Sequence, residues 1–130
     1  MMYPEPEWKM RMRVPVSKLE VETITEMGKR KLNRGLTSNE PVILTFCKPD
    51  LKWDFCKMAV FLDGIAVHSS ETKCLKDQAI TDALIDRGWR VLRIRYKSPA
   101  SETRKKEIWD KIQAFLETSE AFCRATGLIR

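Results

Sequence analysis

Residues 48–68 decide the fold of this chain, and they read KPDLKWDFCKMAVFLDGIAVH. Leu51 to Trp53 is a short run that indicates a strand. Residues 58–62 form a nearly continuous apolar run, as in a strand that is buried on both faces. Asp63 and Gly64 follow with turn chemistry that should end this second strand. The stretch therefore predicts two adjacent strands with acidic residues at their ends.

A helix and a further strand are predicted before this stretch. Ser17 is a suitable N-cap, with Glu20 three residues later as its capping-box partner. The helix should continue to residue 33 or 34, where Gly35 would end it in the C′ position. Residues 42–47 are apolar and partly β-branched, which predicts a strand. The buried stripe of the helix is expected to consist of Val21, Ile24, Met27 or Gly28, and Leu32.

Two helices and one strand are predicted after the stretch. A helix over about residues 72–87 should stop at Gly88, and residues 89–96 are rich in Val, Leu and Ile, which indicates a strand. Pro99 would open the last helix at its first position, and this helix should extend to about residue 126. The residues expected on its buried face are Ile108, Trp109, Ile112, Phe115, Leu116 and Phe122.

The order of these elements predicts the fold class. The helix between the strands at residues 58–62 and 89–96 is a crossover of the kind that joins parallel strands. We therefore expect an α/β sandwich with a mixed central sheet of about four strands, flanked by helices. Prolines exclude a regular helix at the start, so residues 1–16 should form an irregular arm and residues 17–130 a single domain.

Composition narrows the class of protein. The chain has 130 residues, of which 43% are hydrophobic and 32% charged, and these values are typical of one folded domain. No apolar run approaches the roughly 20 residues that span a bilayer. Residues 1–16 lack the apolar core of a secretory signal. We therefore expect a cytoplasmic protein without a membrane partner.

The cysteines do not have the spacing of a metal site. They stand at positions 47, 56, 74 and 123, form no Cys-x-x-Cys pair, and have no nearby histidine partner. A structural zinc site is therefore not expected. Buried, reduced thiols are the usual state of such residues in a cytosolic protein.

The positive charge of the chain indicates a nucleic-acid partner. The net charge is +6, and the basic residues are clustered. Clusters of this kind can also be solvated surfaces or favourable cations at helix C-termini. The residues expected to contact phosphates are Lys9, Arg11, Arg13, Lys48, Arg93 and Arg95.

Two carboxylates and the single histidine fall at the predicted strand ends. Asp50 follows Pro49 at the start of one strand, and Asp63 stands at the end of the next. Magnesium prefers one or two carboxylates with waters, and the main-chain carbonyl of Leu62 is a further candidate ligand. His68 is suited to act as general base or to stabilise phosphate charge. Each of these motifs can also be purely structural, because Pro-Asp and Asp-Gly are common in turns and a single histidine often packs in the core or caps a helix.

The ordered set resembles the PD-(D/E)XK nuclease superfamily, and within it the very-short-patch-repair-endonuclease-like branch with its DUF559 relatives. The resemblance rests on Pro-Asp at 49–50, the hydrophobic strand ending in Asp-Gly at 63–64, and His68. It also rests on Asp77 in a helix and on Gly-Trp-Arg-Val-Leu-Arg at residues 88–93. It covers about residues 17–96 and implies a restriction-endonuclease-like fold.

The resemblance also implies an activity, which is cleavage of DNA phosphodiester bonds with Mg²⁺, for which Mn²⁺ can substitute. Asp50 would be the principal metal ligand, with Asp63 and the main chain of Leu62 beside it. His68 would lie near the scissile phosphate, and Asp77 could orient His68. A glutamate on the first helix often completes such a site, for which Glu22 is the first candidate and Glu20 the second.

The chain departs from the family pattern at several positions. Many members have Glu where this chain has Phe61 and Lys where it has Asp63, although Phe61 is shared with the short-patch-repair type. Without that lysine, His68 would have to stabilise the attacking water. Residues 65–67 are Ile-Ala-Val, where short-patch-repair enzymes have a zinc site and DNA-wedging aromatic residues. Neither zinc nor mismatch repair is therefore implied.

Two other functions remain open at this stage. The chain could be a non-catalytic nucleic-acid-binding domain that retains the nuclease fold. Alternatively, its charges could serve solubility, with residues 101–126 forming a dimer surface. A nuclease of this size could also act as a homodimer or with a larger partner protein that supplies specificity.

Overall fold

The computed structural model describes residues 17–42, 48–64 and 71–127, except for the side chains of residues 71–74. Its strands form one four-stranded sheet in the order β1-β2-β3-β4. The strands are β1 (Leu36–Thr37), β2 (Leu51–Trp53), β3 (Met58–Gly64) and β4 (Arg90–Tyr96). The helices are α2 (Lys18–Lys29), α3 (Glu71–Asp86), α4 (Glu102–Glu117), α5 (Glu120–Thr126) and the short 3₁₀-helix η1 (Asp54–Cys56). The predicted α/β class is confirmed.

The sheet is mixed, as the sequence predicted. β1 pairs with β2, and β2 with β3, in antiparallel fashion, whereas β3 and β4 are parallel. The parallel pair is joined through α3, which is the crossover helix expected from the order of the elements. β2 and β3 are joined by η1 and by Lys57, whose φ of 53° turns the chain back on itself.

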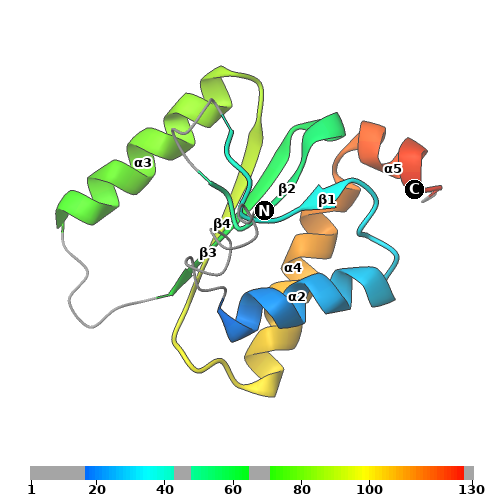
Figure 1. The fold of residues 1–130 in the computed structure, drawn as a ribbon, viewed down its shortest axis with the longest axis horizontal. Helices are drawn as coiled ribbons and strands as arrows, with labels where there is room; N and C mark the ends of the chain where they lie inside the picture. Colours follow the sequence, from blue (N-terminus) through cyan, green and yellow to red (C-terminus); the bar gives the residue numbers. More distant parts are fainter. Residues whose placement is uncertain (1–16, 43–47, 65–70, 128–130) are drawn as a thin grey trace, which may run out of the picture.

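β3 lies in the centre of the molecule and is buried on both faces (Figure 1). One core cluster contains Met58, Val60 and Leu62 together with residues of α2, α4 and α5. Alternate residues of β3, Ala59 and Phe61, belong to a smaller cluster with Leu84 of α3. The sheet therefore separates α3 from α2 and α4.

β3 is longer than the sequence predicted. Asp63 and Gly64 were expected to form a turn, but they continue the strand and pair with Arg95 and Tyr96 of β4. The expectation was wrong because parallel pairing with β4 extends to this point and outweighs the local turn preference. β1 was not predicted, and the strand predicted at residues 42–47 lies outside the described residues except for Val42. The arm at residues 1–16 also lies outside them.

α2 begins as predicted but ends early. The hydroxyl of Ser17 accepts a hydrogen bond from the Glu20 amide at 3.1 Å, which confirms the N-cap. The helix ends at Lys29, and Lys31 adopts a left-handed φ of 60°. The amide of Leu32 then donates to Met27 O at 2.8 Å, which closes the helix five residues before the predicted end at 34 and directs Leu32 into the core.

The packed face of α2 also differs from the prediction. Leu19, Thr23 and Met27 are its buried residues, whereas Val21 is 53% exposed. Gly35, expected to end the helix, instead lies against the ring of Phe55. Its φ is 77°, and an added Cβ would meet that ring at 2.8 Å.

The last predicted helix is interrupted. α4 begins at Glu102 with Ser101 as its N-cap, so Pro99 is not its first residue. The helix ends at Glu117, and the hydroxyl of Ser119 accepts from the Phe122 amide at 3.1 Å to start α5. This cap competes with continuation of the helix. The break places Phe122 edge-on to Trp53, with ring centroids 6.3 Å apart.

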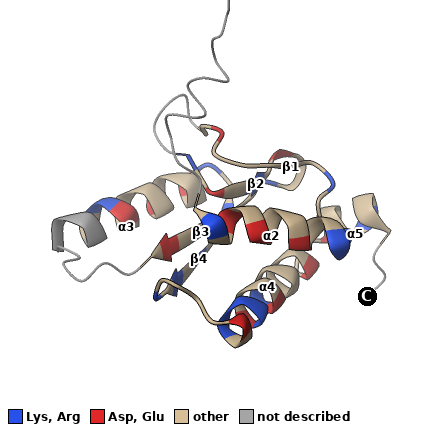
Figure 2. Cartoon of the chain, turned by 60° about the horizontal axis from the view of Figure 1, so that its bottom comes forward, with Lys and Arg blue, Asp and Glu red and all other residues tan. Residues whose placement is uncertain are grey.

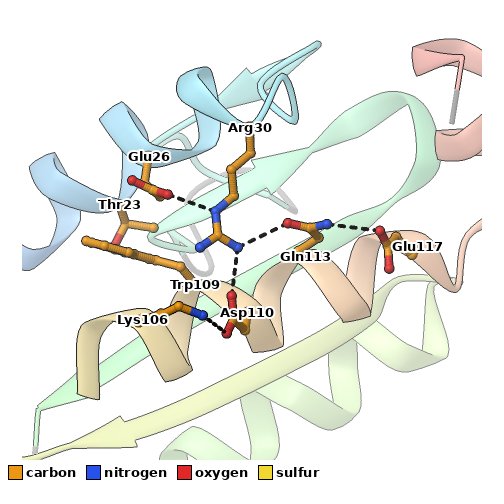
Figure 3. A network of polar contacts seen from close by, with 8 residues as sticks. All are labelled: Thr23, Glu26, Arg30, Lys106, Trp109, Asp110, Gln113 and Glu117. Carbon is orange, nitrogen blue, oxygen red and sulfur yellow. Dashed lines mark hydrogen bonds and ion pairs between the residues drawn. The ribbon is translucent and has the colours of Figure 1, made fainter. Parts of the chain in front are cut away.

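α2 is held against α4 by polar contacts (Figure 3). The indole Nε1 of Trp109 donates to Thr23 Oγ1 at 2.9 Å. The guanidinium of Arg30 donates to Asp110 Oδ1 and to Gln113 Oε1, both at 3.0 Å. These contacts fix the rotation of α2 relative to the rest of the domain.

The helices and the cysteines can both be compared with what the sequence predicted. In residues 17–42, 48–64 and 71–127, no helix has the length and apolar character needed to cross a membrane. Cys123 is buried and Cys56 is half-buried, both as free thiols, and burial raises the pKa of the Cys56 thiol.

Candidate active site

Asp50 lies where the pairing of β2 with β3 ends. The antiparallel register stops at Leu51 opposite Val60. Beyond it, Leu62 N donates to the carboxyl oxygen Oδ2 of Asp50 at 2.6 Å. The carboxyl group of Asp50 thus takes the place of a main-chain acceptor for β3. This hydrogen bond anchors Asp50 to the strand that continues to Asp63.

Asp50 forms a carboxyl pair with Glu20 of α2. Burial raises the pKa of Asp50 to about 8, and the hydrogen bond from its carboxyl group to Glu20 adds to this. The Leu62 amide acts in the opposite direction, while the negative charges of Glu20 and Asp63 raise the pKa further. At neutral pH, Asp50 therefore retains its proton. Two carboxyl groups held this close create a place where a cation can replace that proton.

Glu22, the first candidate for the helix glutamate, lies elsewhere. Its Oε2 accepts from Lys105 Nζ of α4 at 2.9 Å. Residues two apart on a helix with 3.6 residues per turn project from nearly opposite sides, so only one of the two glutamates can face Asp50. The structure has Glu20 beside Asp50, and which glutamate completes a site stays a prediction.

Asp63 is near this pair but has a cationic partner of its own. Both of its carboxylate oxygens accept from Arg93 Nη1, at 3.2 and 3.1 Å. Arg93 Nε also donates to Thr81 Oγ1 at 2.6 Å, and Nη2 donates to the main-chain oxygen of Asp77 at 3.1 Å. The guanidinium carbon of Arg93 lies 4.0 Å from the centre of the Phe61 ring. The guanidinium is thus directed at protein groups, and the contact of Arg93 with nucleic acid stays a prediction.

An open pocket lies beside Asp63. Its volume is about 260 Å³, and its lining residues are Asp63, Asp77, Gln78, Arg93 and Arg95. Asp77 is on α3, as predicted, and Arg95 is exposed on β4 opposite Asp63 in the sheet register. Among the described residues, the structure shows no ion pair of the Arg95 side chain. The pocket therefore combines carboxylate and guanidinium groups a short distance from the Glu20–Asp50 pair.

Several predicted site residues belong to segments that the structure does not describe. His68, Lys9, Arg11 and Arg13 lie outside the described residues. Lys48 is described and is exposed just before Pro49. Figure 2 shows further Lys and Arg segments at the end of β4 and in the first turns of α4.

The oxygen groups at Asp50 fit a hard divalent cation. Among the described residues, no group of three or more His, Cys, Asp or Glu side chains is arranged to hold a metal. Magnesium, however, commonly binds one or two carboxylates and keeps several waters. Glu20 and Asp50 supply two carboxylates, and the main chain of Leu62 is adjacent to them. The observation that supports this fit is the half-buried carboxyl group of Asp50, which lies beside Glu20 and is hydrogen-bonded to the Leu62 amide.

Asn39 is a site residue that sequence reasoning missed. Its Nδ2 donates to Glu20 Oε1 at 3.1 Å, and its main-chain amide donates to Pro49 O at 3.2 Å. The available signal was an asparagine in a short polar connection, because asparagine tolerates the left-handed backbone that such turns require. That signal predicts a turn but does not identify the partners of the side chain.

The mixed sheet and its crossover helix define an α/β fold. Among solved structures, the chain is similar to "Homing Endonuclease I-Bth0305I Catalytic Domain", with a TM-score of 0.60 and 18% sequence identity. The match covers 78% of this chain and 96% of that one. No family model and no curated protein matches the sequence. The predicted nuclease-like fold is confirmed, while the PD-(D/E)XK branch stays a prediction.

Proposed function

We propose that this protein is a metal-dependent endonuclease that hydrolyses phosphodiester bonds in DNA. The observation that carries the proposal is the pairing of Glu20 with Asp50, the residue just before β2. This pair lies in a fold similar to the catalytic domain of a homing endonuclease. A domain that only binds nucleic acid needs no such carboxyl pair, whereas a magnesium site does.

Glu20, Asp50 and the main chain of Leu62 would hold Mg²⁺ or Mn²⁺. When bound, such an ion supplies electrophilic stabilisation of the phosphoryl oxygens and lowers the pKa of water. Asp50 must release its proton for this role, and the Leu62 amide keeps its carboxylate oriented as it does so. Arg93 holds Asp63 at the rim of the pocket, where a carboxylate can accept a hydrogen bond from the attacking water.

His68 and Asp77 complete the proposed mechanism. His68 would accept the proton of the attacking water or stabilise charge on the scissile phosphate, and Asp77 would orient the imidazole. Arg95 and Lys48 would contact phosphates from the exposed surface, together with Lys9, Arg11 and Arg13 of the N-terminal arm. Such contacts release counterions, so DNA binding should weaken steeply with salt. Cleavage of both strands would favour a homodimer, with one site on each strand.

A second function is favoured by one specific observation. Asp63 is already neutralised by Arg93, and the described residues contain no cluster of three metal-ligating side chains. A domain that binds DNA without cutting it would be compatible with this arrangement. The two functions differ in whether the Glu20–Asp50 pair is needed for an observable reaction.

Nicking of supercoiled plasmid in Mg²⁺ or Mn²⁺ tests the proposal. The parent protein and Glu22→Gln should nick, whereas Asp50→Asn and Glu20→Gln should not. Glu22→Gln is the matched control, because it removes a carboxylate from the same helix on the side facing α4. Nicking by Glu20→Gln at the parental rate would disprove the site. Salt-sensitive plasmid binding without nicking by the parent would favour the binding domain.

A further inference from the structure

The connection between α2 and β2 contacts both elements that contribute a carboxyl group. Asn39 is the residue that makes these contacts. Its side-chain amide donates to Glu20 on α2, at 3.1 Å, and its main-chain amide donates to Pro49, the residue before Asp50, at 3.2 Å. One residue thus ties together two carboxyl groups that are thirty positions apart in the sequence.

The residue type suits both contacts. Asn39 has a φ of 56°, in the left-handed region that asparagine enters more readily than most other residues. Its amide is a neutral donor, so it orients Glu20 without neutralising it. A lysine or arginine would do the opposite, as Lys105 does where it pairs with Glu22. The charge of Glu20 therefore remains available for the proton of Asp50 or a cation.

We infer that Asn39 is a positioning residue that sets the divalent-cation affinity of the Glu20–Asp50 pair. The inference rests on the proposed function, because it takes this pair as the cation site. The Nδ2 donor limits the rotamers of Glu20 and keeps its carboxyl group turned toward Asp50. The main-chain donor holds the chain at Pro49, so both ligands are in place before a cation arrives. Groups that orient metal ligands in this way typically change metal affinity about 10- to 100-fold when removed.

Asn39→Gly tests the inference directly. Glycine keeps the left-handed backbone and the main-chain donor to Pro49, and it removes only the side-chain amide. The matched control is Asn33→Gly, which removes an exposed amide from the same connection. The readout is the affinity for Mn²⁺ alone, measured by isothermal titration calorimetry, with circular dichroism in EDTA to establish that each variant is folded. We expect Asn39→Gly to bind Mn²⁺ at least about tenfold more weakly than the parent, and Asn33→Gly to match the parent.

A double-mutant cycle separates positioning from a general structural effect. If Asn39 acts through Glu20, then Asn39→Gly should cause no further loss of Mn²⁺ affinity in a Glu20→Gln background. Should Asn39→Gly not fold, Asn39→Ser gives the same comparison, because its hydroxyl is too short to reach Glu20.

The possible outcomes distinguish this inference from the proposed function. Parental Mn²⁺ affinity in folded Asn39→Gly would overturn the inference and leave the proposed cation site intact. Equal losses from Asn39→Gly in the parent and Glu20→Gln backgrounds would also overturn it. Absence of Mn²⁺ binding by the parent would instead remove the proposed metal-dependent function, and the inference with it.

Discussion

Replacing Asp50 by asparagine should make the cation-free protein more stable at alkaline pH. Asparagine mimics the protonated carboxyl group, because its oxygen can accept from the Leu62 amide and its NH₂ group can donate to Glu20. Unlike the carboxyl group, it never acquires a negative charge. The comparison therefore isolates the cost of ionising Asp50 inside the folded protein.

The magnitude follows from the pKa of Asp50, which burial and Glu20 raise from an ordinary 3.8 to about 8. Between these values the unfolded chain has lost the proton while the folded protein still holds it, so the free energy of unfolding falls as pH rises. The slope is about 1.4 kcal/mol per pH unit, and by pH 8 the accumulated loss reaches up to about 5 kcal/mol. Asp50→Asn should escape this loss entirely.

Urea denaturation in EDTA at pH 5 and pH 8 measures the effect. The advantage of Asp50→Asn over the parent should grow by about 4 kcal/mol between pH 5 and pH 8. Titrating groups that do not interact with Asp50 are common to both proteins and cancel in the difference. Asp82→Asn, which changes an exposed carboxylate on α3, should follow the parent at both pH values. Added Mn²⁺ at pH 8 should stabilise the parent but not Asp50→Asn. A difference between parent and Asp50→Asn that does not change with pH would refute the raised pKa of Asp50.

Three other changes probe the surroundings of the site. Arg93→Met should lower the free energy of unfolding by about 2–4 kcal/mol, measured in urea, because it leaves Asp63 without its partner in a partly buried position. Arg93→Lys should recover only part of that loss, since lysine cannot contact three groups in one plane, and full recovery would contradict this account. Arg95→Ala should weaken plasmid binding and reduce its salt dependence by about one phosphate contact without changing the unfolding midpoint; an unchanged salt slope would place Arg95 outside the DNA-binding surface. Trp109→Phe removes the hydrogen bond to Thr23 and should cost about 1 kcal/mol in the same urea assay, and a neutral result would mean that this bond does not hold α2.

The central architecture could be predicted from sequence because its signals are local. The apolar run at residues 58–62 identified a doubly buried strand, and the helix after it identified a parallel crossover. The end of β3 could not be predicted, since Asp-Gly favours a turn locally and only pairing with β4 keeps it extended. The break before α5 depends in the same way on a cap at Ser119 and on the core position of Phe122.

The candidate site was only partly accessible to sequence reasoning. Asp50 followed from the Pro-Asp motif, but the choice between Glu20 and Glu22 depends on how α2 is rotated against α4. That rotation is set by contacts such as Thr23 with Trp109, which no local pattern reveals. Arg93 looked like one of several basic residues, and its pairing with Asp63 becomes visible only when β3 and β4 are side by side.

The polar contacts between α2 and α4 determine when α2 can be fixed in place during synthesis of the chain. The contacts of Glu22 with Lys105 and of Thr23 with Trp109 join residues that are 83 and 86 positions apart. At translation rates of about 5–20 residues per second, α4 is synthesised several seconds after α2. Until then α2 lacks the contacts with α4 that fix its rotation. The packing of α2 is therefore completed only after α4 has been synthesised, although α2 precedes the whole sheet in the chain.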